Sequence, residues 1–193
     1  EIEPGLINIL TMLGNICRRQ HDFAKAADYF TRALAIDRNN SYAIFGMADA
    51  LRGLKDYAGA LPWWREIMRL DPDNRKVLTR SADCMIHLDL LDEAETILAS
   101  VLAATWDRFA VFAIARIQRM TNRTDQALQN YRALLIDDPT DVRTIMHIAE
   151  TTIETDGLEA ALAFLHGKKA ELSGLRELGS AIDAFMKNRL DPV

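Results

Sequence analysis

The sequence predicts an all-α fold, a helical solenoid of about five helix–turn–helix units followed by a C-terminal capping helix. The composition supports this, because hydrophobic residues make up 49%, charged residues 26%, and only 9 Gly and 5 Pro interrupt the chain. Apolar residues also recur three and four positions apart, which is one face of a helix. A short sequence pattern also recurs at a nearly constant interval, which is typical of a repeat array.

One alanine marks the second helix of each unit, and successive alanines lie 34, 34, 33 and 34 residues apart. A large side chain follows each alanine four positions later, on the same helical face. The alanine allows two helices to approach, and the large side chain fills the neighbouring gap. The alanines are Ala26, Ala60, Ala94, Ala127 and Ala161, and the large residues are Phe30, Trp64, Leu98, Tyr131 and Leu165.

The same register predicts where each unit begins and ends. Polar stretches separate the helices, and Asp22, Asp56 and Asp156 are in position to cap second helices. The single 33-residue interval places a deletion between Ala104 and Arg108, where we expect a change of twist. The predicted boundaries are an N-terminal linker at 1–6, repeats at 7–40, 41–74, 75–107, 108–141 and 142–172, and a capping helix at 173–193.

These units resemble the tetratricopeptide repeat family, whose 34-residue pattern combines Leu-Gly, Ala, an aromatic residue and Pro. The resemblance covers residues 7 to 172, although the third and fifth units are degenerate. It implies a right-handed α-solenoid with a concave groove, made by the first helix of each unit, that binds a peptide or protein segment. The matching residues are Leu13, Gly14, Ala26 and Phe30 in the first unit, Ala60, Trp64 and Pro72 in the second, and Ala127, Tyr131 and Pro139 in the fourth.

The groove residues implied by the resemblance are rich in arginine and aromatic side chains, as binding hot spots are. This face is cationic although the chain has a formal net charge of -5. We therefore predict an acidic or carboxylate-terminated partner. The alternative is that the aromatic residues pack between helices and the arginines are either solvated or paired with Asp49, Asp83 and Glu150. The predicted groove residues are Asn15, Arg18, Tyr42, Phe45, Arg52, Lys76, Arg80, Phe109, Phe112, Arg116, Arg119 and Arg143.

Some members of the family bind the C-terminal carboxylates of heat-shock chaperones through a clamp of Lys, Asn, Asn, Lys and Arg. Here Asn15, Lys76 and Arg80 match three of the five positions, whereas Thr11 and Gly46 replace the other two. This departure favours a looser recognition of carboxylates by arginine.

The sequence predicts no enzyme, no catalytic residue, no metal site and no cofactor. It contains no phosphate-binding Gly-rich loop, no His-Glu-x-x-His and no Cys-x-x-Cys. Asp83 and His87 are one helical turn apart, but two ligands do not close a metal site. Cys17 and Cys84 lie in apolar helical patterns of different repeats, so we expect two small buried side chains and no disulfide.

The charge and the chain ends limit the classes of partner further. A pI of about 5.4 argues against nucleic acid, and no uninterrupted apolar run is long enough to span a bilayer. The first residues lack an initiating Met and a basic region, so we expect a segment of a longer chain. Two alternatives to a binding groove stay open. One is self-association through Trp63, the shortened turn or a solenoid end. The other is a non-catalytic repeat domain of a larger enzyme or of a secretion or assembly machine.

Overall fold

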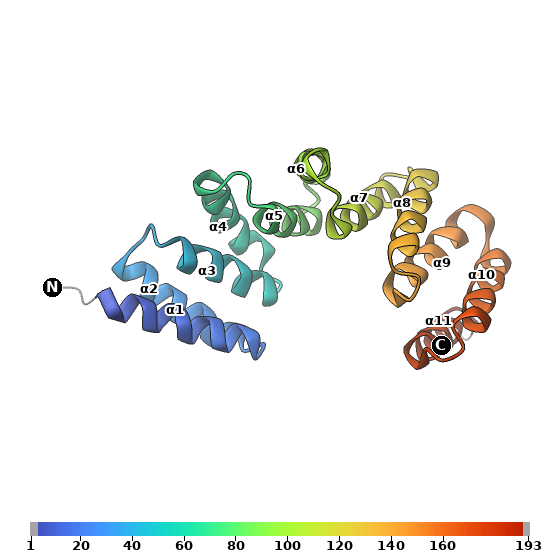
Figure 1. Cartoon of the computed structure of the whole chain (residues 1–193), viewed down its shortest axis with the longest axis horizontal. Helices are drawn as coiled ribbons and strands as arrows, with labels where there is room; N and C mark the ends of the chain where they lie inside the picture. Colours follow the sequence, from blue (N-terminus) through green and yellow to red (C-terminus); the bar gives the residue numbers. More distant parts are fainter. Residues whose placement is uncertain (1–3, 191–193) are drawn as a thin grey trace. The chain divides into compact units, whose positions relative to one another are not determined.

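The fold is known from a computed structural model that describes residues 4–190. Within this range the chain forms eleven α-helices and no strand, so the predicted all-α repeat fold is confirmed (Figure 1). None of the described helices is both long and apolar enough to cross a membrane. The helices are α1 (Pro4–Arg19), α2 (Phe23–Ile36), α3 (Ser41–Gly53), α4 (Tyr57–Leu70), α5 (Arg75–His87), α6 (Leu91–Ala104), α7 (Arg108–Met120), α8 (Thr124–Asp137), α9 (Val142–Asp156), α10 (Leu158–Glu171) and α11 (Arg176–Leu190).

The helices form two compact units, which we call unit one (Glu1–Thr105) and unit two (Trp106–Val193). The boundary between them falls in the turn from Ala104 to Arg108, where the sequence lacks one residue. Each helix of unit one packs against the next, and the first helices of its repeats also meet, α1 with α3 and α3 with α5. In unit two, α7 to α10 pack in sequence, and α11 lies against α9 and α10.

The core follows the alanine register. All five register alanines are fully buried, and so are the five large side chains four positions later. Glycine permits a close approach around Phe30, since a Cβ at Gly14 in the first repeat or at Gly46 in the second would overlap its ring. The ring of Phe30 therefore occupies the space between α1 and α3 that these glycines leave open.

The turns between the two helices of each repeat contain a residue with positive φ. Four of these are not glycine: His21 (61°), Lys55 (62°), Asp89 (60°) and Asn122 (58°). The predicted caps Asp22 and Asp56 do accept hydrogen bonds from the N–H groups of Lys25 and Gly59. The cap predicted at Asp156 is wrong, because Asp156 is the last residue of α9 and the turn is made by Gly157 (φ 87°).

Both terminal elements differ slightly from the predicted boundaries. Helix α1 begins at Pro4, inside the predicted linker, because proline suits the first position of a helix. Helix α11 begins at Arg176 and not at Ser173. Its residues Leu178, Ile182 and Phe185 pack against the core that α9 and α10 supply. The linker residues 1–3 and the last residues, 191–193, lie outside the described part of the chain.

Candidate functional site

The predicted groove residues all lie on the first helices of the repeats. Each unit forms its own cluster of side chains. In unit one, α1 carries Asn15 and Arg18, α3 carries Tyr42, Phe45 and Arg52, and α5 carries Lys76 and Arg80; in unit two, α7 carries Phe109, Phe112, Arg116 and Arg119, and α9 carries Arg143.

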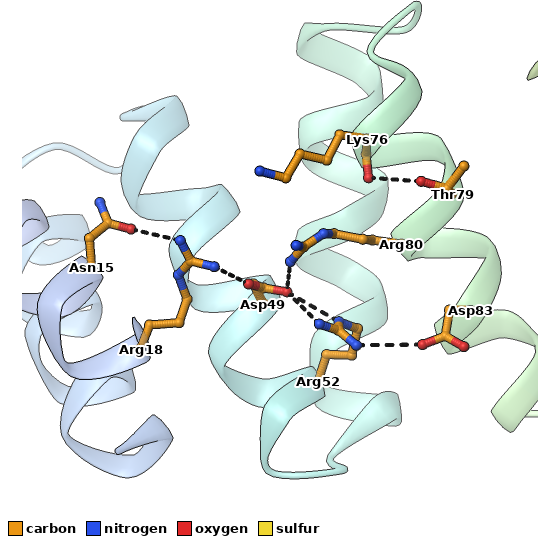
Figure 2. A network of polar contacts seen from close by, with 8 residues as sticks. All are labelled: Asn15, Arg18, Asp49, Arg52, Lys76, Thr79, Arg80 and Asp83. Atoms are coloured by element: carbon orange, nitrogen blue, oxygen red, sulfur yellow. Dashed lines mark hydrogen bonds and ion pairs between the residues drawn. The ribbon is translucent and has the colours of Figure 1, made fainter. Parts of the chain in front are cut away.

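The central feature of unit one is Asp49, which is only 3% exposed and binds three arginines (Figure 2). Its Oδ1 accepts hydrogen bonds from Arg52 Nε at 3.1 Å and Arg52 Nη2 at 2.9 Å, and also from Arg80 Nη1. Its Oδ2 accepts from Arg18 Nη1. One carboxylate on α3 therefore joins α1, α3 and α5. We call Asp49, Arg18, Arg52 and Arg80 the Asp49 cluster.

The Asp49 cluster carries more positive than negative charge. Burial by itself would raise the pKa of Asp49, but the guanidinium groups of Arg80 and Arg52 outweigh it and hold the pKa below its ordinary value. The carboxylate is therefore ionised at neutral pH. Asp83 contributes a second negative charge, 3.6 Å from Arg52 Nη1. Two carboxylates thus face three guanidinium groups.

Aromatic side chains continue this surface toward the start of α3 and α5. The ring of Phe45 meets Trp64 edge to face, with centroids 5.4 Å apart. Two cations lie over the same ring, Lys76 Nζ at 5.5 Å and Arg80 Cζ at 5.6 Å from its centroid. Tyr42 is 76% exposed. Two cations therefore cover the partly buried ring of Phe45, and the exposed ring of Tyr42 lies one helical turn away on α3.

Arg119 holds the equivalent surface of unit two together. It donates from Nη1 to Glu150 at 2.6 Å, and from Nη2 and Nε to Glu154 at 2.8 and 2.9 Å. Burial alone would lower the pKa of Arg119, but Glu154 and Glu150 more than offset it and raise the pKa. The sequence reasoning missed Glu154. Its position one helical turn after Glu150 on α9 was a usable signal.

Three rings are in contact with one another in unit two. Phe112 lies edge to face with Tyr131 at 5.6 Å and with His147 at 5.0 Å, and Tyr131 stacks on His147 at 5.5 Å. The hydroxyl of Tyr131 and Nδ1 of His147 are buried without a hydrogen-bond partner among the described residues. Burial raises the pKa of Tyr131 to about 12 and lowers the pKa of His147. The positive charge of Arg116 lowers the pKa of both groups.

A pocket of about 290 Å³ opens beside these rings. Its apolar wall includes Phe109, which is 69% exposed. Arg108 was not predicted as a site residue, yet it donates from Nη2 to Asp141 at 2.8 Å and lies 3.6 Å from Asp138. The pocket is lined by Arg108, Phe109, Phe112, Leu134, Asp138, Asp141 and Arg143.

Six of the seven predicted cations, all except Arg116, therefore fall into two groups. Arg18, Arg52, Arg80 and Arg119 bind carboxylates, as the alternative interpretation of the sequence had it. Lys76 and Arg143 instead lie over aromatic rings, and no ion pair is formed by either within the described part of the chain. Both of these cations are exposed.

The described residues include no group of three or more side chains suited to hold a metal ion. Cys17 and Cys84 are both free. Cys84 is buried as expected, whereas Cys17 is only partly buried. Burial raises the pKa of Cys84 to about 11, although the neighbouring indole of Trp64 partly counteracts this. The thiol of Cys84 is therefore protonated at neutral pH and is a core side chain, not a nucleophile.

Two sequence profiles of the tetratricopeptide repeat match the chain, one at residues 7–40 and one at residues 51–116. Together they cover just over half of the sequence. The chain belongs to the tetratricopeptide repeat family. Repeats of this family generally act as non-catalytic scaffolds for protein interactions.

Among curated proteins, this tetratricopeptide repeat chain is similar to anaphase-promoting complex subunit 3 of Schizosaccharomyces pombe (strain 972 / ATCC 24843). The two are 34% identical over 77 residues, which is 40% of this chain. The chain spans only 12% of the length of that relative.

Solved structures agree on the fold. PilW, described as a widely conserved type IV pilus biogenesis factor, superimposes with a TM-score of 0.76 at 16% identity, covering 99% of this chain and 96% of PilW. The first tetratricopeptide repeat domain of Spaghetti (RPAP3), solved with the HSP90 peptide SRMEEVD, gives a TM-score of 0.58 at 21% identity, over 63% of this chain and 97% of that one. At these identities the likeness shows the fold alone.

Proposed function

We propose that the chain is a protein-interaction scaffold whose first helices bind an acidic or carboxylate-terminated segment of a partner. The observation that carries this proposal is the Asp49 cluster, in which three successive first helices each direct an arginine at one carboxylate. The RPAP3 domain of similar fold was solved with a peptide that ends in Glu-Glu-Val-Asp. That precedent supports acidic segments as the class of ligand.

The geometry of the cluster favours a further carboxylate. A guanidinium has five N–H donors. Arg18 and Arg80 each make a single hydrogen bond to Asp49, through Nη1, and Arg18 also donates from Nη2 to Asn15 at 3.2 Å. Asp49 holds the guanidinium groups in place while leaving donors for a second acceptor. Lys76 lies next to Arg80 on α5, and in Figure 2 its ammonium group extends toward the cluster. Charge-assisted hydrogen bonds of this kind are among the strongest that proteins make.

The experiment that tests this is a binding titration with the labelled peptide SRMEEVD and its C-terminal amide. We choose Lys76→Glu as the variant, because Arg80→Glu would place a second carboxylate beside buried Asp49 and disturb the fold. Lys76→Glu should weaken binding more than tenfold, about 1.4 kcal/mol. Binding by the wild-type chain should also weaken with salt, since the Debye length falls from about 10 Å at 0.1 M to about 3 Å at 1 M.

The matched control is Arg132→Glu, which makes the same change of charge on the exposed side of the second helix α8. It should leave the affinity unchanged. Equal binding by Lys76→Glu and wild type, or no binding of the acidic peptide by either, would remove the cationic surface of unit one as the ligand site.

A second candidate function, self-association, is favoured by a stripe of exposed apolar side chains on α1. Ile9 is 55%, Met12 63% and Ile16 45% exposed. The equivalent residues 34 positions later, Ala43, Gly46 and Ala50, are buried. The stripe is thus a surface of the kind that another helix covers elsewhere in the array. Trp63 is less suited to this role, because it packs partly buried against the core of unit one.

Light scattering over a range of concentrations tests this second candidate. If α1 self-associates, the wild-type chain should dimerise, and the double substitution Ile9→Ser with Met12→Ser should yield a monomer of unchanged helicity. A wild-type chain that is monomeric at every concentration would contradict it.

A further inference from the structure

An aromatic pair occurs twice on the first helices, once in each unit. Tyr42 and Phe45 open α3, and Phe109 and Phe112 open α7, exactly two repeats or 67 residues later. In the repeat that follows each pair, a cation occupies the position that corresponds to the first ring of the pair. These cations are Lys76 on α5 and Arg143 on α9. In the first repeat the corresponding residues are Asn8 and Thr11, so the pair does not belong to every repeat.

The contacts within the two sets are also equivalent. The inner ring meets the large core side chain of its own repeat edge to face, Phe45 with Trp64 at 5.4 Å and Phe112 with Tyr131 at 5.6 Å. The cation lies over that inner ring, Lys76 Nζ at 5.5 Å and Arg143 Cζ at 4.0 Å from the centroid. The outer ring is largely exposed in both sets.

In unit two these residues line the pocket of about 290 Å³, which is small for a whole ligand but suited to one side chain. Its walls are apolar where Phe109, Phe112 and Leu134 lie. The two carboxylates at its edge, Asp138 and Asp141, are both engaged by Arg108. Arg143 is left as the exposed positive charge, with no ion pair in the described part of the chain. The pocket therefore combines an apolar interior with a cation at the rim.

We infer that Phe109, Phe112 and Arg143 form an anchoring site for an apolar side chain that has a carboxylate beside it in the partner chain. The side chain enters between the rings and leaves water, while the carboxylate meets Arg143. Tyr42, Phe45 and Lys76 form a second site of the same chemistry in unit one. The site in unit two goes beyond the proposed function, because it does not involve the Asp49 cluster.

Amide and side-chain NMR shifts of the whole labelled chain test this assignment. The probe is the capped tetrapeptide acetyl-Leu-Glu-Leu-Glu amide. Two matched peptides replace either both Glu by Gln or both Leu by Gly, and N-acetyl-leucine carries a terminal carboxylate in place of the side-chain one. The first peptide should shift Phe109, Phe112 and Arg143, with at least tenfold weaker binding by the Gln and Gly peptides. N-acetyl-leucine should also shift these residues if a terminal carboxylate serves, and should leave them unchanged if only a side-chain carboxylate reaches Arg143.

Variants assign the shifts to one unit. Arg143→Glu should remove the shifts of Phe109 and Phe112 and keep those of Tyr42 and Phe45, whereas Lys76→Glu should do the reverse. Arg132→Glu, the outer-face control, should change neither set. Each variant alters an exposed side chain, and an otherwise unchanged amide spectrum confirms its fold.

Three results would overturn the inference. Equal shifts with the Gln peptide would exclude the carboxylate, equal shifts with the Gly peptide would exclude the apolar anchor, and no shift at Phe109 and Phe112 would exclude the site in unit two. These three results do not depend on whether SRMEEVD binds unit one. The proposed function and this inference can therefore be contradicted independently of each other.

Discussion

The second and fourth repeats present the same rings on their first helices but differ in the charge behind them. In unit one, Asp49 is buried and three arginines bind it. The equivalent residue in unit two is Arg116, and His147 stands where unit one has Arg80. There Arg119 is the shared ion, bound by Glu150 and Glu154. One backbone register thus supports two opposite arrangements of charge, with an acid at the centre in one unit and a base in the other.

This difference separates what the fold requires from what binding requires. Both units keep a small residue, a large core ring and helical spacing, because these fill the space between helices. The ions on the first helices are not fixed in that way. Asp49 is fully enclosed, so its charge is costly to leave unpaired, whereas Glu150 and Glu154 are partly exposed to water. The two ion networks should therefore respond very differently to substitution.

The largest expected effect is loss of the Asp49 carboxylate. Asp49→Asn should cost on the order of 3–5 kcal/mol, because three guanidinium groups lose their shared partner in a buried site. Urea denaturation gives the change in the free energy of unfolding, and hydrogen exchange should show it on α1, α3 and α5. The counterpart in unit two, Glu150→Gln, should cost only about 0–1 kcal/mol, as partly exposed ion pairs do. Similar losses for both substitutions would show that the two networks are equivalent after all.

A smaller effect comes from the glycines. Gly46→Ala should destabilise unit one by about 1–3 kcal/mol, because the new Cβ would overlap the buried ring of Phe30. Gly167 lies inside α10, and a Cβ there meets nothing within 4 Å. Gly167→Ala should therefore stabilise unit two by about 0.5–1 kcal/mol through helix propensity. Thermal denaturation of the two variants should give shifts of opposite sign, and shifts of the same sign would refute the packing argument.

The sequence predicted the parts of this fold that depend on spacing. The alanine register placed the ten core residues of the second helices correctly, because close approach of two helices requires small residues at fixed intervals. It also placed every predicted groove residue on a first helix. The binding of three arginines to Asp49 could not be predicted from spacing. Asp49 lies 31 residues from both Arg18 and Arg80, and spacing alone does not say which acid an arginine side chain reaches.

At other points the residue types of a segment predicted the wrong local structure or predicted nothing. Asn122, Asp89 and His21 are of residue types that adopt positive φ more often than most, but Lys55 adopts it too, because the turn between two packed helices imposes it. Asp156 looked like a cap by composition, yet α9 ends two residues later than the other first helices do and Gly157 makes the turn. The pocket depends on Arg108 binding two carboxylates, a contact between elements that no single segment predicts.

The next effect concerns the core ring that differs between the units. The hydroxyl of Tyr131 is buried without a hydrogen-bond partner among the described residues, and such a group costs about 1–3 kcal/mol. Tyr131→Phe should therefore stabilise unit two by about 1 kcal/mol, as measured by urea denaturation. Tyr42→Phe is the control, since that hydroxyl belongs to a largely exposed side chain and its loss should change stability by less than about 0.5 kcal/mol. A destabilised Tyr131→Phe would mean that the hydroxyl has a partner in solution.

The smallest expected effect is a difference in pH response. Burial lowers the pKa of His147, and Arg119, Arg143 and Arg116 lower it further, while Glu150 opposes them. The unfolded chain, with an ordinary His pKa of about 6.5, therefore binds a proton at a pH where the folded chain does not. Unit two should lose stability as the pH falls through about 6.5. Asp49 has a lowered pKa, so its contribution to the stability of unit one persists until the pH falls below about 4.

Lowering the pH from 7.4 to 5.8 should thus lower the melting temperature less in His147→Gln than in the wild-type chain. Equal falls in the two proteins would show that His147 is not the group that titrates.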